Sequence, residues 1–232
     1  NYDGIRSKNF GATTFLVNAS VGGDMDQTFS GLLKWAGIRA KQNLPALFPD
    51  VTGVADKRAQ FVVGKSANDA PTVFTDGLGS TKFRNRTRTD GFGTDPNREF
   101  SDIDFPIFRL AEMYLIYSEA VLRGATTGTA AQSLTYINLL RQRAYQGTSG
   151  NITAGSLNLD FILDERGREL YWEGFRRTDL LRFDDKFTKG TYLWPWKGAN
   201  RNGAALGAHQ NLYPIPDSEV AANPNIKQNT GY

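Results

Sequence analysis

The sequence predicts a mainly α fold of helical hairpins, with long ordered loops and a few short strands. Apolar residues recur at helical spacing within residues 101–187, which we expect to form the hairpins. Residues 1–100 are rich in Gly, Asn, Thr and Asp and contain only short apolar runs, so we expect loops held against a scaffold. Residues 188–232 lack a regular pattern and are interpreted as a loop with an extended tail. With 232 residues, 40% of them hydrophobic, the chain can bury a sizeable core.

The loop-rich part contains a few local signals of regular structure. Residues 13–17 and 60–63 are short runs rich in β-branched and aromatic residues, which are typical of strands. The Asp-Gly pairs at 76–77 and 90–91 are typical of turns. Residues 29–43 are predicted to form a short helix that two glycines weaken.

Two strong helices are predicted next. The first covers residues 106–123, where Pro106 suits the first turn and Gly124 suits the end. The second covers residues 130–144, and because the connection is short the two form an antiparallel hairpin, the shape of a tetratricopeptide-like unit. The residues expected to face inward are Ile107, Leu110, Ala111, Tyr114, Leu115, Ala120 and Val121 on the first helix and Ala131, Leu134, Ile137, Leu139 and Leu140 on the second.

A third helix is predicted over residues 158–173 and a shorter fourth helix over residues 175–183, after a break at Gly174. Three glutamates spaced four residues apart share one stripe of the third helix, and opposite charges lie three and four residues from one another. We interpret them as a structural ion-pair network that holds the helix break. Its predicted members are Glu165, Arg166, Glu169, Glu173, Arg176, Asp179 and Arg182.

The same glutamates allow a catalytic interpretation. A glycosidase needs two carboxylates roughly 5–10 Å apart, one of them acting as a general acid with a raised pKa. Helical spacing could provide that distance. However, neighbouring guanidinium groups lower the pKa of a carboxyl group. We therefore expect no catalytic residue here. The guanidinium groups belong to Arg166, Arg168, Arg176 and Arg177.

Composition excludes several classes of site. The chain has no cysteine, which excludes disulfides, cysteine-ligated metals and thiol nucleophiles, and its one histidine, His209, is interpreted as a solvated loop residue. Residues 24–28 open like a calcium loop, but Phe29 and Trp35 stand where an EF-hand needs Gly and Glu. No stretch approaches the roughly 18 apolar residues of a membrane span. We expect no metal and no cofactor.

The net charge of +3 is too small to indicate nucleic-acid binding by itself, and we expect none. One basic run nevertheless stands out, because Lys82, Arg84, Arg86 and Arg88 alternate with other residues. In an extended strand all four would lie on one face. They indicate either a solvated edge strand or a binding site for an acidic sugar or a phosphate.

Aromatic residues supply the candidate ligand-binding positions. A flat ring beside polar side chains suits a sugar, which presents apolar faces and hydroxyl rims. Trp194 and Trp196 flank a proline, so in an extended segment both would face one way, with Arg201 close behind them. The alternative is that this loop packs against another part of a longer protein or against a partner protein. The further candidates are Tyr2 and Arg6 near the start of the chain and Trp35, which could equally be a core residue.

Several segments in this order resemble the SusD/RagB family of outer-membrane nutrient-binding lipoproteins. Weaker upstream markers are WAG at 35–37 and DKR at 56–58. The main segments are DFPIFRLAEMYLIYSEA at 104–120, ER and EL at 165–166 and 169–170, EGFRRTDLLR at 173–182, LYPIP at 212–216 and NPNIKQNTGY at 223–232.

The resemblance implies a mostly helical fold and non-catalytic binding of a glycan, or alternatively of an oligopeptide. It implies delivery to a SusC-type TonB-dependent transporter. It also implies a place on the outward-facing surface of the outer membrane, anchored through a lipidated N-terminus that is not part of this chain. The chain resembles the C-terminal half of such proteins, so the N-terminal half is a further expected partner. A helical-repeat scaffold that binds only protein is the alternative from another class.

Overall fold

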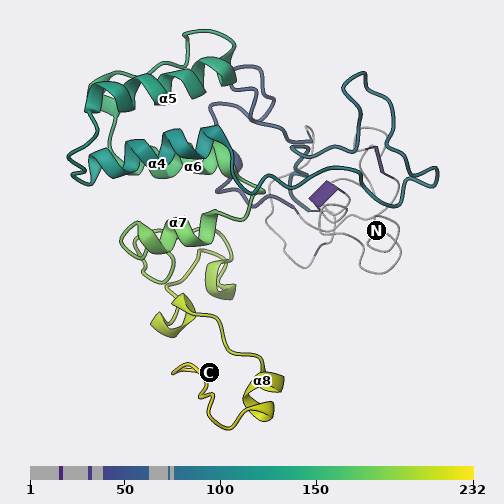
Figure 1. Cartoon of the computed structure of the whole chain (residues 1–232), viewed down its shortest axis with the longest axis vertical. Coiled ribbons are helices and arrows are strands. Elements are labelled where there is room, and N and C mark those ends of the chain that lie inside the picture. The colour runs from purple at the N-terminus through teal and green to yellow at the C-terminus, as the bar shows by residue number, and fades with distance from the viewer. Residues whose placement is uncertain (1–15, 18–30, 33–38, 63–72, 74–75) are drawn as a thin grey trace. The chain divides into compact units, whose positions relative to one another are not determined.

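The computed structural model describes residues 16–17, 31–32, 39–62, 73 and 76–232 (Figure 1). The chain divides into two compact units, Asn1–Phe175 and Arg176–Tyr232, and each is described by itself. Across the described residues the fold is mainly α, as the sequence predicts, and pairing between extended segments is limited to isolated bridges. No helix in these ranges is long and apolar enough to cross a membrane.

Two helices of the first unit form the predicted hairpin. Helix α4 covers Leu110–Leu122 and helix α5 covers Ala130–Tyr145, and they pack side by side. The rings of Tyr114 and Tyr136 stack between them, with centroids 4.3 Å apart. Helix α5 begins where the Thr129 side chain accepts a hydrogen bond from the Gln132 backbone, which satisfies one free N–H group.

Helix α4 begins later than the sequence predicts. Its N-cap, Arg109, has extended backbone with φ −149° and ψ 153°, and the three residues before it are not helical either. Pro106 therefore precedes the helix instead of occupying its first turn. The side chain of Arg109, the residue before the helix, belongs to the polar network that is described below.

The buried face of α4 also differs from the prediction. Its buried residues are Ala111, Glu112, Leu115, Ser118 and Glu119, and the helix packs against α5 and the third helix. Leu110 is 64% exposed, and Leu139 on α5 is 45% exposed. The predicted inward face is therefore confirmed at Ala111, Leu115, Ile137 and Leu140, and it is wrong at Ile107, Leu110 and Leu139. Apolar side chains that lie exposed on and just before α4 are Phe105, Ile107, Phe108, Leu110, Met113 and Ile116.

Helix α6 covers Leu159–Leu170 and buries Ile162, Leu163 and Leu170. The Asn158 side chain caps its first turn by accepting a hydrogen bond from the Phe161 backbone. The helix ends three residues before the predicted position.

The break after α6 spans several residues. Tyr171 leaves the helical conformation, Trp172 has φ +66° and Gly174 has φ +82°. A glycine adopts this left-handed conformation without steric cost, which agrees with the predicted break at Gly174. Helix α7 then covers Arg176–Arg182 and begins the second unit.

A small aromatic core joins the loop-rich part of the first unit to the turn after α6. The rings of Phe48, Phe61 and Tyr171 pack against one another with centroids 5.6–6.0 Å apart. Of the predicted strand at 60–63, residues 60–62 are described, and their pairing is an isolated bridge between Phe61 and Ser80. Two short 3₁₀ helices complete this unit, η1 at Pro45–Leu47 and η2 at Ala154–Ser156.

Two other predictions fall largely outside the described residues. Of the predicted strand at 13–17 only residues 16–17 are described, and they are helical. Of the predicted helix at 29–43, residues 31–32 form a bend and residues 39–43 are not helical.

The second unit is small and built mostly from turns. Besides α7 it contains η3 at Lys197–Ala199, η4 at Ala208–Asn211 and α8 at Asp217–Ala222. Leu180 and Phe183 on and beside α7 are its buried apolar side chains. The Gln228 side chain exchanges two hydrogen bonds of 2.8 Å with the backbone of Ile215, which folds the tail back on itself.

Candidate functional site

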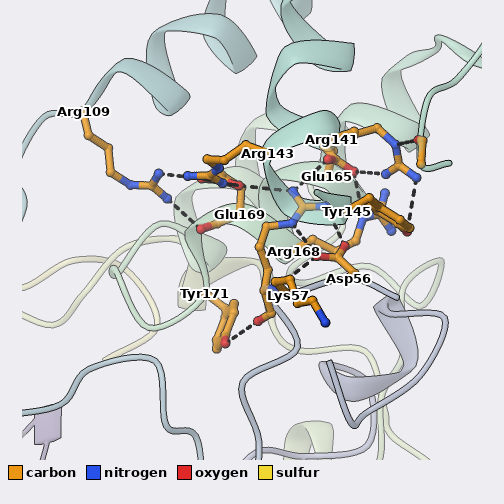
Figure 2. A network of polar contacts seen from close by, with 12 residues as sticks. Asp56, Lys57, Arg109, Arg141, Arg143, Tyr145, Glu165, Arg168, Glu169 and Tyr171 are labelled. Atoms are coloured by element: carbon orange, nitrogen blue, oxygen red, sulfur yellow. Dashed lines mark hydrogen bonds and ion pairs between the residues drawn. The ribbon is translucent and has the colours of Figure 1, made fainter. Parts of the chain in front are cut away.

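A buried glutamate forms the centre of a polar network in the first unit (Figure 2). The carboxylate of Glu165, on α6, accepts hydrogen bonds of 2.8 Å from each of three guanidinium groups, those of Arg58, Arg141 and Arg168. Arg141 comes from α5, and Arg58 comes from the loop-rich part. One carboxylate thus ties three segments of the chain together.

Glu169, one turn further along α6, performs the same task for another set of segments. It accepts hydrogen bonds from Arg58 at 3.1 Å, from Arg109 at 2.6 Å and from Arg143 at 2.6 Å. Figure 2 shows Arg109 and Arg143 converging on this carboxylate. Because Arg109 is the N-cap of α4, Glu169 links the start of α4 to α5 and α6.

Glu173 joins the network from the turn after α6. Arg109 donates to its carboxylate at 2.7 Å, and Lys82 forms an ion pair with it. Lys82 also donates to the carbonyl oxygens of Glu169 and Tyr171, at 2.9 and 2.7 Å. The three glutamates do not share one helical stripe, since α6 ends before the third. The turn brings Glu173 to the network instead.

The partners of these glutamates differ from the neighbours that the sequence suggests. Arg168 pairs with Glu165, whereas the guanidinium of Arg166 lies 5.8 Å from the ring centroid of Phe175. Most partners are separated from their glutamate by 24 to 111 residues, so no local pattern identifies them. These distant partners are Arg58, Lys82, Arg109, Arg141 and Arg143.

The other members of the predicted network lie in the second unit. Arg182 donates to the carboxylate of Asp179 at 2.8 Å, at the i, i+3 spacing that the sequence suggests. Arg176 donates to the hydroxyl of Tyr192, and its guanidinium lies 5.3 Å from that ring.

The guanidinium groups keep the network carboxylates ionised. Burial by itself raises the pKa of Glu165, but three neighbouring positive charges outweigh it and lower the pKa to about 2. The pKa of Glu169 is also lowered, because hydrogen bonding to Arg109 and the charges around it outweigh burial. A general acid needs a pKa near the working pH. The geometry therefore favours a structural role for both carboxylates.

The basic run does not form one face of a strand. Lys82 points into the network, where burial lowers its pKa to about 8. Arg84 donates to the carboxylate of Asp90 at 2.9 Å, and Arg86 donates to the carbonyl oxygen of Asp90 and lies 4.2 Å from the ring of Phe92. Residues 86–92 form a turn closed by a bridge, so the alternating pattern is broken.

A cavity of about 350 Å³ lies beside the network, in the first unit. Most of the charged residues in its lining are basic, and we call it the cationic cavity. The charged residues that line it are Lys57, Arg58, Lys82, Arg109, Arg143, Arg168, Glu169 and Glu173, and the others are Gln60, Phe83, Pro106, Ala144 and Tyr171.

The predicted aromatic site lies in the second unit, in residues 188–204, which we call the tryptophan loop. Trp194 and Trp196 are both half-buried. The segment between them is a turn and Trp196 has φ +68°, so the extended geometry that would make both rings face one way is wrong. The ring of Tyr192 meets Trp194 edge-on, with centroids 5.9 Å apart.

A buried lysine organises the tryptophan loop. The ammonium group of Lys197 donates to the carbonyl oxygens of Lys186, Lys189 and Tyr192 at 2.8–3.2 Å. It also lies 4.6 Å from the ring of Trp194 and so covers one side of that ring.

Polar residues lie next to the tryptophans. Arg201 is exposed, and its carbonyl oxygen accepts a hydrogen bond of 3.3 Å from the Trp196 backbone. The other predicted candidates, Tyr2, Arg6 and Trp35, lie outside the described residues. Within the described ranges, no group of three His, Cys, Asp or Glu side chains is placed to hold a metal ion.

Comparison with known sequences gives two matches. The model of the SusD family matches residues 50–232. The starch-binding protein SusD of Bacteroides thetaiotaomicron is 38% identical over 217 residues. That alignment covers 90% of this chain but 36% of the relative, so the chain spans about a third of its length.

Solved structures give the same result. A SusD superfamily protein from Bacteroides thetaiotaomicron is 29% identical, with a TM-score of 0.53, 81% of this chain covered and 39% of that structure. A surface glycan-binding protein A from the same species, in complex with laminarihexaose, has a TM-score of 0.65 at 19% identity and covers 94% of this chain and 47% of its own. The latter shows the shared fold. The sequence matches and the fold together show that this chain belongs to the SusD family.

Proposed function

We propose that the protein binds an oligosaccharide at the outer surface of the cell and holds it without breaking a covalent bond. The observation that carries this proposal is the 38% identity to a starch-binding protein over 90% of the chain. That relative makes a starch-type glucan the first ligand to test.

The arrangement of carboxylates supports binding without catalysis. A retaining or inverting glycosidase needs one protonated carboxyl group beside the scissile bond. Glu165 and Glu169 are each held by three guanidinium groups, and both have lowered pKa values. A carboxylate so held is ionised at neutral pH and has its oxygen atoms occupied.

We propose the tryptophan loop as part of the binding surface. Trp194 and Trp196 supply half-buried indole rings, and exposed polar groups stand beside them on Asn200, Arg201 and Asn202. Sugar recognition combines such flat apolar contacts with a few oriented polar groups. The loop is held in place by the buried ammonium group of Lys197, so its rings are preorganised.

We further propose, on the family resemblance, that the ligand passes to a SusC-type TonB-dependent transporter and that a lipidated N-terminus anchors the protein in the outer membrane. The exposed apolar side chains beside and on α4, such as Phe108 at 82% exposure, favour a covering partner. The N-terminal half of the longer protein is the proposed partner for this face.

The test is a panel of glycans and peptides offered to the full-length protein. We expect binding of α-glucan oligosaccharides by isothermal titration calorimetry, a raised melting temperature in their presence, and no new reducing ends after prolonged incubation. Binding of oligopeptides without binding of any glycan would show that the ligand is a peptide. Absence of any thermal shift with glycans and peptides would indicate a scaffold for protein partners, and release of reducing sugar at enzymatic rates would overturn the proposal.

A further inference from the structure

The cationic cavity carries more positive than negative charge. Its lining contains six basic and two acidic side chains. Including the ionised groups directly behind the lining, the network of described residues holds seven basic groups and four acidic ones. The basic groups are Lys57, Arg58, Lys82, Arg109, Arg141, Arg143 and Arg168, and the acidic ones are Asp56, Glu165, Glu169 and Glu173. Ion pairing within the network thus leaves an excess of cationic charge around a cavity.

Two of these cations stand at the rim with donors to spare. The ammonium group of Lys57 is exposed and donates to the carbonyl oxygen of Val54 at 3.0 Å. The side chain of Arg143 is 56% exposed and uses one terminal nitrogen to bind Glu169. The Lys57 backbone donates to the carbonyl oxygen of Ala144 at 2.9 Å, which joins the loop that carries Lys57 to the end of α5 that carries Arg143.

Lys82 lies deeper in the cavity. Its ammonium group faces the Glu173 carboxylate, the carbonyl oxygens of Glu169 and Tyr171, the Tyr171 ring at 4.6 Å and the guanidinium of Arg109. Burial lowers the pKa of this lysine to about 8, and the positive charge of Arg109 adds to the effect, although Glu173 opposes it. An anion bound in the cavity would stabilise the charged form of Lys82 and raise its pKa.

We propose that the cationic cavity binds an oxyanion, with Lys57 and Arg143 as the outer donors and Lys82 and Arg109 at its inner wall. The class includes the carboxylate of an acidic sugar as well as free sulfate or phosphate, which share charge and hydrogen-bond acceptors. Charge-assisted hydrogen bonds from lysine and arginine are the usual means of holding such groups. The site lies in the first unit and is independent of the tryptophan loop.

The test compares anions at equal ionic strength. Sodium sulfate, phosphate and glucuronate are titrated into the protein against sodium chloride, with melting temperature and calorimetric heat as readouts. We expect one or more of the oxyanions to raise the melting temperature beyond chloride. Binding of glucuronate identifies an acidic sugar as the source, and binding of sulfate or phosphate alone identifies the free ion.

Lys57→Gln is the decisive variant, because among the residues that the structure describes this side chain forms a hydrogen bond to the Val54 carbonyl oxygen and no ion pair. We expect it to weaken oxyanion binding about tenfold, the effect of losing one charge-assisted hydrogen bond. Lys227→Gln, which removes an exposed lysine of the second unit, is the matched control and should leave binding unchanged.

A second readout follows the lysine inside the cavity. At pH 8, oxyanion binding should raise the pKa of Lys82 and so take up protons, which calorimetry in two buffers of different ionisation enthalpy measures. Equal binding by Lys57→Gln and Lys227→Gln, or no thermal shift beyond chloride with any of the three oxyanions, would overturn the proposal.

Discussion

The α6 network and the tryptophan loop hold their charged groups in opposite ways. In the network, Glu165 and Glu169 bind guanidinium groups from segments far apart in the sequence. In the loop, the Lys197 ammonium binds carbonyl oxygens that lie within eleven residues of it. The first arrangement joins the elements of a unit to one another, whereas the second shapes one loop and leaves indole rings half-exposed.

The difference indicates where a ligand can be accommodated without loss of the fold. A carboxylate whose oxygens are all occupied cannot receive a substrate unless an ion pair breaks, and breaking a buried pair is costly. A loop held by its own backbone can present side chains to a ligand while the rest of the unit stays intact. We therefore propose that the buried carboxylates of the network stabilise the fold and that the tryptophan loop is where a glycan is recognised.

The largest effect is expected when the carboxylate at the centre of the network is removed. Glu165→Gln leaves three guanidinium groups without their shared partner, so we expect the free energy of unfolding to fall by about 3–5 kcal/mol. Urea denaturation followed by circular dichroism measures it. Asp104→Asn, at an exposed position of the same unit, is the control and should change stability by less than about 0.5 kcal/mol.

The pH dependence of stability tests the same role of Glu165. The pKa of Glu165 is lowered from 4.5 to about 2 in the folded state, so its contribution is fully present above pH 4.5 and is lost as the pH falls toward 2. We expect a loss of about 3 kcal/mol over this window from this group. Denaturation curves at pH 6, 4, 3 and 2 follow it. The dependence should be weaker in Glu165→Gln, and an equal slope in both proteins would contradict the assignment.

The next test removes the cation that organises the loop. Lys197→Met leaves three carbonyl oxygens without a buried donor, and we expect a loss of about 2–3 kcal/mol. Lys189→Met, whose exposed side chain donates to one carbonyl oxygen, is the matched control. If both variants unfold at the same denaturant concentration, Lys197 does not hold the loop.

Substitution of two glycines is expected to change stability by a smaller amount, and the two variants are compared with each other. Gly174 has φ +82° and open space around it, so Gly174→Ala should cost about 1–2 kcal/mol through backbone strain alone. Gly203 has φ +79°, but a Cβ atom there would lie 2.5 Å from the carbonyl oxygen of Trp194. Gly203→Ala should therefore cost about 1 kcal/mol more and also disturb the tryptophan loop. Equal losses of stability would show that the close approach is unimportant.

The sequence predicts the helices well and their inner faces poorly. The α4–α5 hairpin and the break at Gly174 follow from periodicity, a short connection and a left-handed glycine. Periodicity does not say which apolar residues remain outside, and on α4 the buried residues include Glu112, Ser118 and Glu119 while Leu110 is exposed. Phe108 and Ile107, the apolar residues before this helix, are therefore exposed.

The network was predictable only in part, because most of the basic partners of its glutamates come from elsewhere in the chain. The glutamates are visible as a local pattern, but nothing near Arg58 or Arg109 indicates that these side chains meet α6. The direction of the pKa shift follows from nearby arginines, although they are mostly not the ones adjacent in sequence. The turn at Trp196 was missed because it depends on a left-handed residue that is not glycine.

The most direct test of the central claim measures glycan affinity in three variants of the full-length protein. Trp194→Ala and Trp196→Ala should each weaken binding of an α-glucan oligosaccharide about tenfold or more, in line with the loss of a buried aromatic contact. Val54→Ala, which shortens an exposed apolar side chain of the first unit outside the face proposed to contact the N-terminal half, should bind as the parent does. Unchanged affinity in both tryptophan variants would contradict recognition by the tryptophan loop.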